Sequence, residues 1–247
     1  MALIDVERAV LSVCFAAEPP EASLKQLGEH ERERWLLYRE LTRDRLWHEL
    51  QVALPRTCAA VGEAVLARAF VTHLDRDPPR TRYFREIVLS FAVSARRRWQ
   101  AGSETPPFAI DLLRYEAALW EVSDLEAGAA PDAREFAFDR VPLLTPALRL
   151  LELEHAVHTP GEQSEPARGQ FYVAVQREAD EARPRTWSFN QTTYALLEDF
   201  LRGEVTAAES VQRIAARLGR QVTPQFVERL CESLAQWIEV GILVGSR

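Results

Sequence analysis

Apolar side chains recur three and four positions apart through the first half of the chain, which predicts a helical N-terminal half. Leu37, Leu41 and Leu50 continue this spacing among charged residues, as in a long amphipathic helix. Pro55 fixes its own φ and lacks an N–H, so one helix must end near Leu54 and another must begin just after it. We expect five helices in one bundle, at residues 3–17, 29–54, 56–75 and 82–99, and from beyond Pro107 to about Leu125.

Gly62 lies in the first half of the third expected helix. A glycine there gives up about 1 kcal/mol of helix propensity relative to alanine. Such a glycine often marks the close approach of a neighbouring helix. We therefore expect Gly62 to let the helix at 56–75 pack closely against the helix at 29–54.

The hydrophobic pattern changes after the small residues at 127–131, which predicts two domains, residues 1–127 and 132–247. In the second domain, Leu151-Glu152-Leu153-Glu154 alternates with a period of two, as in a half-buried strand. Leu148 and Leu150 have the opposite parity, so we expect a bulge or twist near Leu150. Strands are expected at residues 135–141, 148–157, 171–175 and 186–189, with a short one at 241–245.

Explicit start signals predict three further helices near the C-terminus. Ser188 with Gln191 and Thr206 with Glu209 fit capping boxes, and Thr223 precedes a proline at a first helical position. The expected fold is mainly α, and α+β overall: a five-helix bundle followed by a winged-helix-like domain with a small antiparallel sheet. The three helices are expected at 190–202, 206–218 and 224–239.

Composition indicates a folded protein that does not bind nucleic acid non-specifically. The chain has 247 residues, 47% of them hydrophobic, and a formal net charge of −7, which opposes contact with phosphates. Cys14, Cys58 and Cys231 lie far apart among apolar residues, so we expect reduced, buried thiols. The first residues lack the basic start of a signal peptide, and no apolar run approaches the ~20 residues that a bilayer requires. A cytoplasmic protein that does not contact membranes is expected.

No arrangement of residues predicts catalysis or metal binding. His155 and His158 are three apart, but at the end of a strand this spacing points their rings to opposite faces. Glu152 and Glu154 are better explained as the solvated face of a strand than as an acid–base pair. There is no phosphate-binding glycine loop, nucleophile elbow or HExxH motif. The sequence therefore favours a binding module over an enzyme.

Two surfaces are candidates for binding. The only basic concentration, which includes Arg80, Arg82 and Arg85, is interleaved with acids and is better suited to a protein partner than to nucleic acid. A sheet edge with unpaired backbone groups can accept a peptide as a further strand, and residues 171–177 or 147–157 could supply that edge. The alternative, that other parts of the chain cover both edges of the sheet, has equal weight.

Short motifs follow one another through the helical half in a specific order. They are Trp35-Leu36-Leu37-Tyr38-Arg39, Leu54-Pro55-Arg56-Thr57, Gly62, Asp77-Pro78-Pro79, Tyr83-Phe84 and Leu113-Arg114-Tyr115-Glu116-Ala117-Ala118. This order resembles the N-terminal domain of a bacterial family whose label describes its members as DNA-binding. Such proteins are commonly encoded beside multinuclear non-haem iron-dependent oxidative enzymes. The resemblance extends to the partner subunit of methanobactin-type biosynthesis, and covers residues 5–125 and, more loosely, 135–245.

The resemblance implies a non-catalytic accessory subunit that forms a heterodimer with an iron-dependent oxidase. In such systems the helical domain docks on the oxidase. The C-terminal module, similar to precursor-peptide recognition elements, holds the leader of a ribosomally made peptide as an added strand for cysteine modification. Iron is expected in the partner, and no cofactor in this chain. The candidate edge residues are Phe171, Tyr172, Val173, Val175 and Arg177, with Arg177 a partner for an acidic leader.

Two other functions stay open at this point. The first is a winged-helix transcription regulator that binds DNA, as the family label suggests. The second is a stand-alone enzyme whose site has no recognisable motif. The acidic net charge argues against the first, and the missing catalytic motifs argue against the second.

Overall fold

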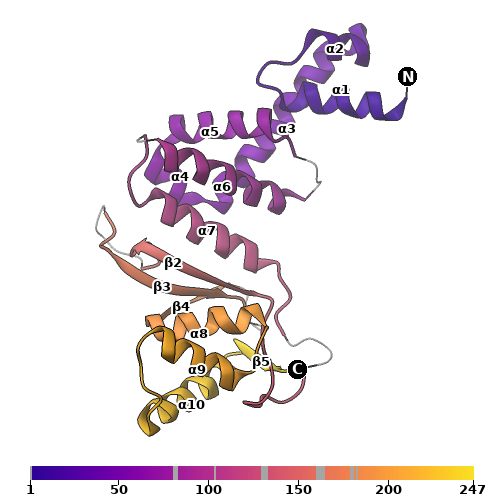
Figure 1. The fold of residues 1–247 in the computed structure, drawn as a ribbon. Helices are drawn as coiled ribbons and strands as arrows, with labels where there is room; N and C mark the ends of the chain where they lie inside the picture. The colour runs from indigo at the N-terminus through magenta and orange to yellow at the C-terminus, as the bar shows by residue number, and fades with distance from the viewer. Residues whose placement is uncertain are drawn as a thin grey trace. The chain divides into compact units, whose positions relative to one another are not determined.

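The computed structural model describes residues 2–79, 83–102, 104–128, 133–159, 165–178, 181 and 183–247, with backbone alone for Glu29 and Phe84. Within these ranges the chain is mainly α with α+β character, as the sequence predicts (Figure 1). The helices are α1 (Leu3–Phe15), α2 (Glu21–Leu27), α3 (Arg32–Ala53), α4 (Pro55–Val61), α5 (Glu63–Arg76), α6 (Phe84–Ala101), α7 (Ala109–Ser123), α8 (Gln191–Arg202), α9 (Ala207–Arg217) and α10 (Pro224–Glu239), with a 3-10 turn at Glu29–Glu31. The strands are β1 (Pro142–Leu144), β2 (Leu148–His155), β3 (Arg168–Gln176), β4 (Arg185–Phe189) and β5 (Leu243–Ser246).

The chain divides into two compact units, Met1–Ala117 and Ala118–Arg247. The division falls within α7, earlier in the chain than the boundary expected at residues 127–132. Residues 129–132 of that expected boundary lie outside the described part of the chain. The first unit contains α1 to α6 and most of α7, so it has more helices than the expected five, because α2 was not predicted and the third helix is divided.

Gly62 divides the third expected helix instead of lying inside it. It has a φ of 78° between α4 and α5, a conformation that L side chains rarely adopt and glycine tolerates. Among the described residues, no heavy atom lies within 4 Å of the position that a Cβ would occupy. The prediction that Gly62 permits close helix packing is therefore wrong, and its role is to end one helix and start the next.

The helix break at Pro55 is confirmed, and a carboxylate from a distant helix completes it. Leu54 ends α3, and Pro55 is the first residue of α4. Buried Glu116 of α7 accepts the backbone N–H groups of Arg56 at 2.9 Å and of Thr57 at 2.7 Å. Because the first N–H groups of a helix have no partner within that helix, Glu116 acts as the cap that α4 lacks locally.

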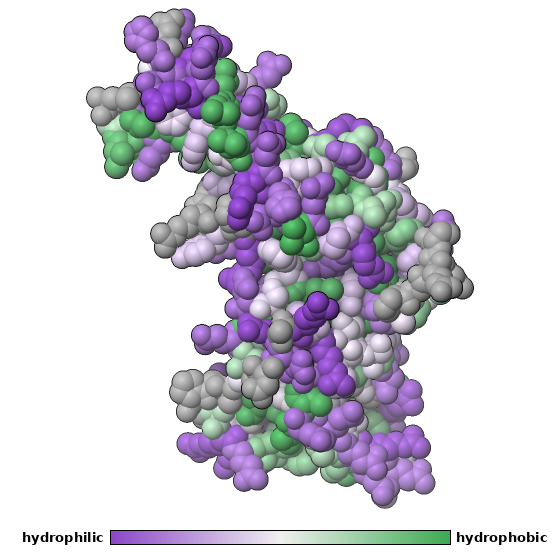
Figure 2. Space-filling model, turned by 180° about the vertical axis from the view of Figure 1, so that it is seen from behind, coloured by the Kyte–Doolittle hydropathy of each residue, from purple (hydrophilic) through white to green (hydrophobic). Residues whose placement is uncertain are grey.

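Only the C-terminal part of the apolar stripe predicted for the long helix α3 is buried. Leu46 and Leu50 lie in the core, whereas Leu37 and Leu41 are 56% and 59% exposed. On the buried side, Arg39 donates to the carbonyl of Val13 at 2.6 Å, near the C-terminal end of α1. Figure 2 shows green apolar patches among purple polar ones on the surface of the N-terminal helices.

The second unit contains a three-stranded antiparallel sheet in the order β2-β3-β4 and a separate pair, β1 with β5. The register shifts between Leu153 and His155, so the irregularity lies further along β2 than the bulge expected near Leu150. The strand expected at residues 135–141 is wrong. Before β1 begins, Arg134 forms an isolated bridge with Ser246, and Val141 exchanges two backbone hydrogen bonds with Arg247.

Three capped helices follow the sheet and share a core with it (Figure 1). Thr206 with Glu209 forms the predicted capping box, and Thr223 caps α10. The cap of α8 is Asn190, whose side chain accepts from the N–H of Thr193, so the capping box expected at Ser188 is wrong. The sheet contributes to the shared core with Leu148 and Ala174, and the helices contribute with Leu197, Phe200, Ile214, Leu234 and Trp237.

Candidate functional site

The strand that carries the predicted edge residues lies in the middle of the sheet. Tyr172 pairs with Glu152 of β2 on one side and with Phe189 of β4 on the other. From Tyr172 to Gln176, backbone groups on both sides of β3 are therefore used within the sheet. The assignment of Tyr172, Val173 and Val175 to a free edge is wrong, because β4 turns back and pairs with them. Phe171 pairs with Leu153 of β2, and the register with β4 begins one residue later.

Burial explains why these residues form a central strand. Val173, Ala174 and Val175 are fully buried in succession, so β3 is covered on both faces along this part. Edge strands with one wet face alternate apolar and polar residues, whereas an unbroken apolar run is typical of a strand buried on both faces. The run from Phe171 to Val175 therefore carried the correct signal, which points to the centre of the sheet.

Arg177, the predicted partner of an acidic leader, is used inside this unit. Its backbone N–H donates to the carbonyl of Ala147 at 3.0 Å. Its guanidinium donates to the carbonyl of Leu125 at 3.1 Å and so ties the segment after α7 to the end of β3. Arg177 thus has a structural role that the sequence did not predict.

Of the three arginines that were predicted to dock on a partner, the structure describes only Arg85. Arg80 and Arg82 lie outside the described residues. Arg85 lies in the first turn of α6, is half-buried and has an interaction partner of its own. Their role in docking stays a prediction.

The two edges of the sheet are β2 and β4. Residues 147–157, the other range that the sequence offered as an edge, include β2. No further strand pairs with β2 or β4 among the described residues. The exposed side chains of the two edges differ in charge: β2 presents Glu152 and Glu154, whereas β4 presents Arg185, with Arg183 just before it.

A buried amide fixes β4 against the helices. Gln176 of β3 accepts the indole N–H of Trp187 at 3.0 Å and donates to the carbonyl of Val240, at the end of α10, at 2.7 Å. The guanidinium of Arg185 lies 4.1 Å from the ring centroid of Trp187 and bonds Glu178 at 3.1 Å. The side chains of this edge are thus held in place before any partner binds.

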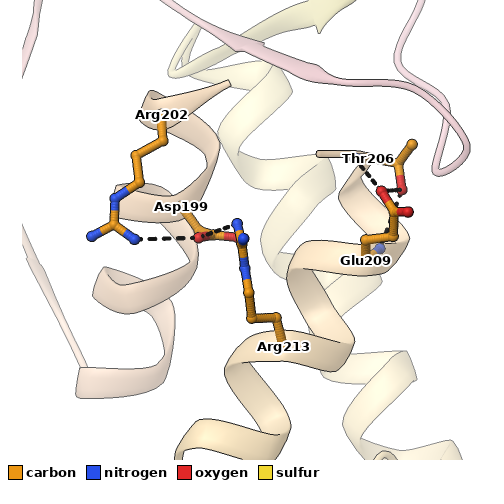
Figure 3. A network of polar contacts seen from close by, with 5 residues as sticks. All are labelled: Asp199, Arg202, Thr206, Glu209 and Arg213. Atoms are coloured by element: carbon orange, nitrogen blue, oxygen red, sulfur yellow. Dashed lines mark hydrogen bonds and ion pairs between the residues drawn. The ribbon is translucent and has the colours of Figure 1, made fainter. Parts of the chain in front are cut away.

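A buried carboxylate joins the first two helices of the trio (Figure 3). Asp199 of α8 is 2% exposed and lies 2.6 Å from Arg213 of α9, with Arg202 at 3.6 Å. Burial acts to raise the pKa of Asp199, but the hydrogen bond and charge of Arg213 and the charge of Arg202 lower it below its ordinary value. The pair orients α8 against α9 and has no contact that indicates catalysis.

The described residues contain no cluster of three or more His, Cys, Asp or Glu side chains that could hold a metal ion. His158 packs against Phe171 with ring centroids 5.5 Å apart, and burial lowers its pKa. In the described part of the chain, no helix combines the length and apolar character that spanning a bilayer requires.

Residues 145–238 match the family model of the HvfC C-terminal domain. The match spans the three-stranded sheet and nearly all of the helix trio. No curated protein matches the chain. The family match supports the broader part of the sequence interpretation, an accessory subunit of a multinuclear non-haem iron-dependent oxidase system for peptide modification.

Proposed function

We propose that this chain is a non-catalytic accessory subunit that holds a precursor peptide for an iron-dependent oxidase. Its winged-helix-like second unit binds the leader of the peptide as an added strand. The observation that carries the proposal is a three-stranded sheet with two edge strands on a capped helix trio, in the region that matches the HvfC C-terminal domain. An edge strand offers unpaired N–H and C=O groups to a peptide.

The acceptor edge in this proposal is β4. The exposed acids Glu152 and Glu154 of β2 repel an acidic leader, whereas exposed Arg183, just before β4, attracts one. The charge of Arg185 in β4 is already paired with Glu178. Trp187 is already fixed by Gln176, so binding at β4 orders few additional side chains. In this account Tyr172 to Val175 of the central strand pair with the acceptor strand β4 and do not contact the peptide.

The helical first unit docks on the oxidase, which supplies the iron and the oxidative chemistry in this proposal. Holding the leader on the accessory subunit raises the local concentration of the cysteine-bearing part of the peptide at the iron site. This gain requires no catalytic residue in the chain described here. The candidate docking cations remain Arg80, Arg82 and Arg85.

Co-expression tests the assembly. The chain is co-expressed with a multinuclear non-haem iron-dependent oxidase from the same genome as the candidate partner, and the mixture is separated by size exclusion. We expect one peak that contains both proteins. In a separate assay without the oxidase, this chain should bind the fluorescein-labelled leader. Separate elution combined with salt-sensitive binding to a defined DNA duplex would contradict the proposal and favour a transcription regulator.

A further inference from the structure

A groove of about 730 Å³ opens on the helical side of the second unit. Residues from the first turn of α8, the turn between α9 and α10, and one face of α10 line it. Buried Leu196, Leu230 and Trp237 contribute its apolar surface, together with half-buried Phe226. This volume is typical of sites that bind a small ligand or a few side chains of a peptide.

The charge of the groove is opposite to that of the unit that contains it. Residues 118–247 carry more Asp and Glu than Arg, yet no acidic residue lines the groove. Its two charged side chains are Arg220 and Arg229, both exposed. Neither of them forms an ion pair or a hydrogen bond with any described side chain, unlike Arg185 and Arg213, which bond Glu178 and Asp199. The groove therefore offers two available cations beside an apolar surface.

The groove begins where the proposed acceptor strand ends. Asn190, which lines the groove, directly follows Phe189, the last residue of β4. The rings of Phe189 and Trp237 lie 6.4 Å apart, so the strand and the groove share an aromatic contact. A peptide that pairs with β4 can therefore continue into the groove.

We infer that this groove binds an acidic anchor of the leader, an apolar side chain next to one or two carboxylates. The apolar side chain packs on Trp237 and its neighbours, and the carboxylates pair with Arg220 and Arg229. Because both cations are exposed, their charge favours an acidic segment and repels a basic one. The inference rests on the proposed function and specifies the kind of leader that the chain selects.

Nucleic acid fits the groove less well. Glu228 and Glu232 are exposed on α10 beside Arg229 and repel a phosphate backbone. Two cations next to an apolar surface suit a short acidic peptide segment better than a continuous polyanion.

The test uses the full chain and a fluorescein-labelled synthetic leader, taken from a candidate precursor, a short cysteine-bearing peptide encoded in the same genome. Fluorescence anisotropy is the measurement. The double variant Arg220→Ala/Arg229→Ala should weaken binding at least tenfold. Arg217→Ala, which removes an exposed cation at the end of α9 outside the groove, should change the Kd less than twofold. A leader whose carboxylates are replaced by amides should bind the wild-type chain as weakly as the intact leader binds the double variant.

A second variant fills the groove without changing its charge. Ser233 lines the groove and Ser233→Phe should weaken leader binding, whereas Gln236→Phe on another face of α10 should not. If the wild-type chain binds the leader and the double variant and Ser233→Phe bind it equally well, the groove inference is wrong and the proposed function stands. If the wild-type chain does not bind the leader, both fail. Binding of a defined DNA duplex that needs Arg220 and Arg229 would also overturn the inference.

Discussion

The side chain of Gln176 accepts a 3.0 Å hydrogen bond from the indole N–H of Trp187, which links the central strand of the sheet to its edge. The same amide donates to the carbonyl of Val240 at the end of α10. Gln176 is 1% exposed, so water cannot replace either bond. One buried side chain thus connects the proposed acceptor strand to the helix that borders the groove.

Replacing Gln176 by Leu should therefore destabilise the second unit and weaken leader binding together. The change leaves a buried donor and a buried acceptor without partners, each of which costs about 1–3 kcal/mol. Urea unfolding of the full chain and leader anisotropy measure the two effects. Gln170→Leu, on an exposed side chain of β3, is the matched control and should leave both nearly unchanged. Unchanged stability of Gln176→Leu would contradict this role.

The ion pair between Asp199 and Arg213 should make stability depend on pH. The folded-state pKa of Asp199 is lowered, so the stabilisation is present above its ordinary pKa of about 4 and is lost as the pH falls through the folded value. At pH 7, Asp199→Asn should cost about 1–3 kcal/mol of unfolding free energy, because it weakens a buried charged hydrogen bond.

Urea unfolding at pH 7, 5 and 3.5 checks this dependence. The difference between wild type and Asp199→Asn should shrink at the lowest pH. Glu232→Gln, on an exposed face of α10, is the control and should show no comparable loss. A difference that stays constant over this range would show that the Asp199 charge does not stabilise the unit.

The cap that Glu116 provides for α4 should be essential to the helix break at Pro55. Glu116→Ala removes the acceptor of the Arg56 and Thr57 N–H groups and should lower the unfolding free energy by about 1–3 kcal/mol. Glu63→Ala, in the first turn of α5 and exposed, should have a smaller effect. Circular dichroism during thermal unfolding measures both. Equal effects of the two changes would contradict a specific capping role.

The three cysteines should differ sharply in reactivity. Burial, together with the negative charge of Glu116, raises the pKa of Cys58 to about 11, and burial also raises the pKa of Cys14. Of the three thiols that were expected to be buried, Cys14 is buried, Cys58 is half-buried and Cys231 is exposed. At pH 8, iodoacetamide should therefore modify Cys231 first, because the thiolate is the reactive form. Mass spectrometry identifies the modified residues, and the urea-unfolded chain should react at all three.

The sequence predicted those features of the fold that have local causes. Pro55 and the Thr206–Glu209 capping box act within a few residues of themselves, and both features occur as predicted. Gly62 was misinterpreted because propensity alone cannot distinguish a glycine packed against another helix from a glycine with positive φ. The exposure of Leu37 and Leu41 was also not predicted, because an apolar stripe does not show how much of a helix other elements cover.

The candidate site depended on long-range pairing, which the sequence specifies less directly. Strands were predicted at both 171–175 and 186–189, and a second strand so soon after the first can return beside it, so that β4 covers one side of β3. Together with the unbroken apolar run around Val173, this pairing identifies β3 as the central strand of the sheet. The groove had no signal in the sequence, because Asn190, Arg220 and Arg229 meet only after the helix trio has packed.

Hydrogen exchange of the full chain with and without the synthetic leader tests the central claim most directly. Strand addition gives the outward N–H groups of the acceptor strand a partner, so their exchange should slow when the leader binds. We predict slower exchange in peptides covering 183–190 and no change in those covering 148–155. Bound leader with unchanged exchange at 183–190 would contradict the proposal that β4 accepts the leader as a strand.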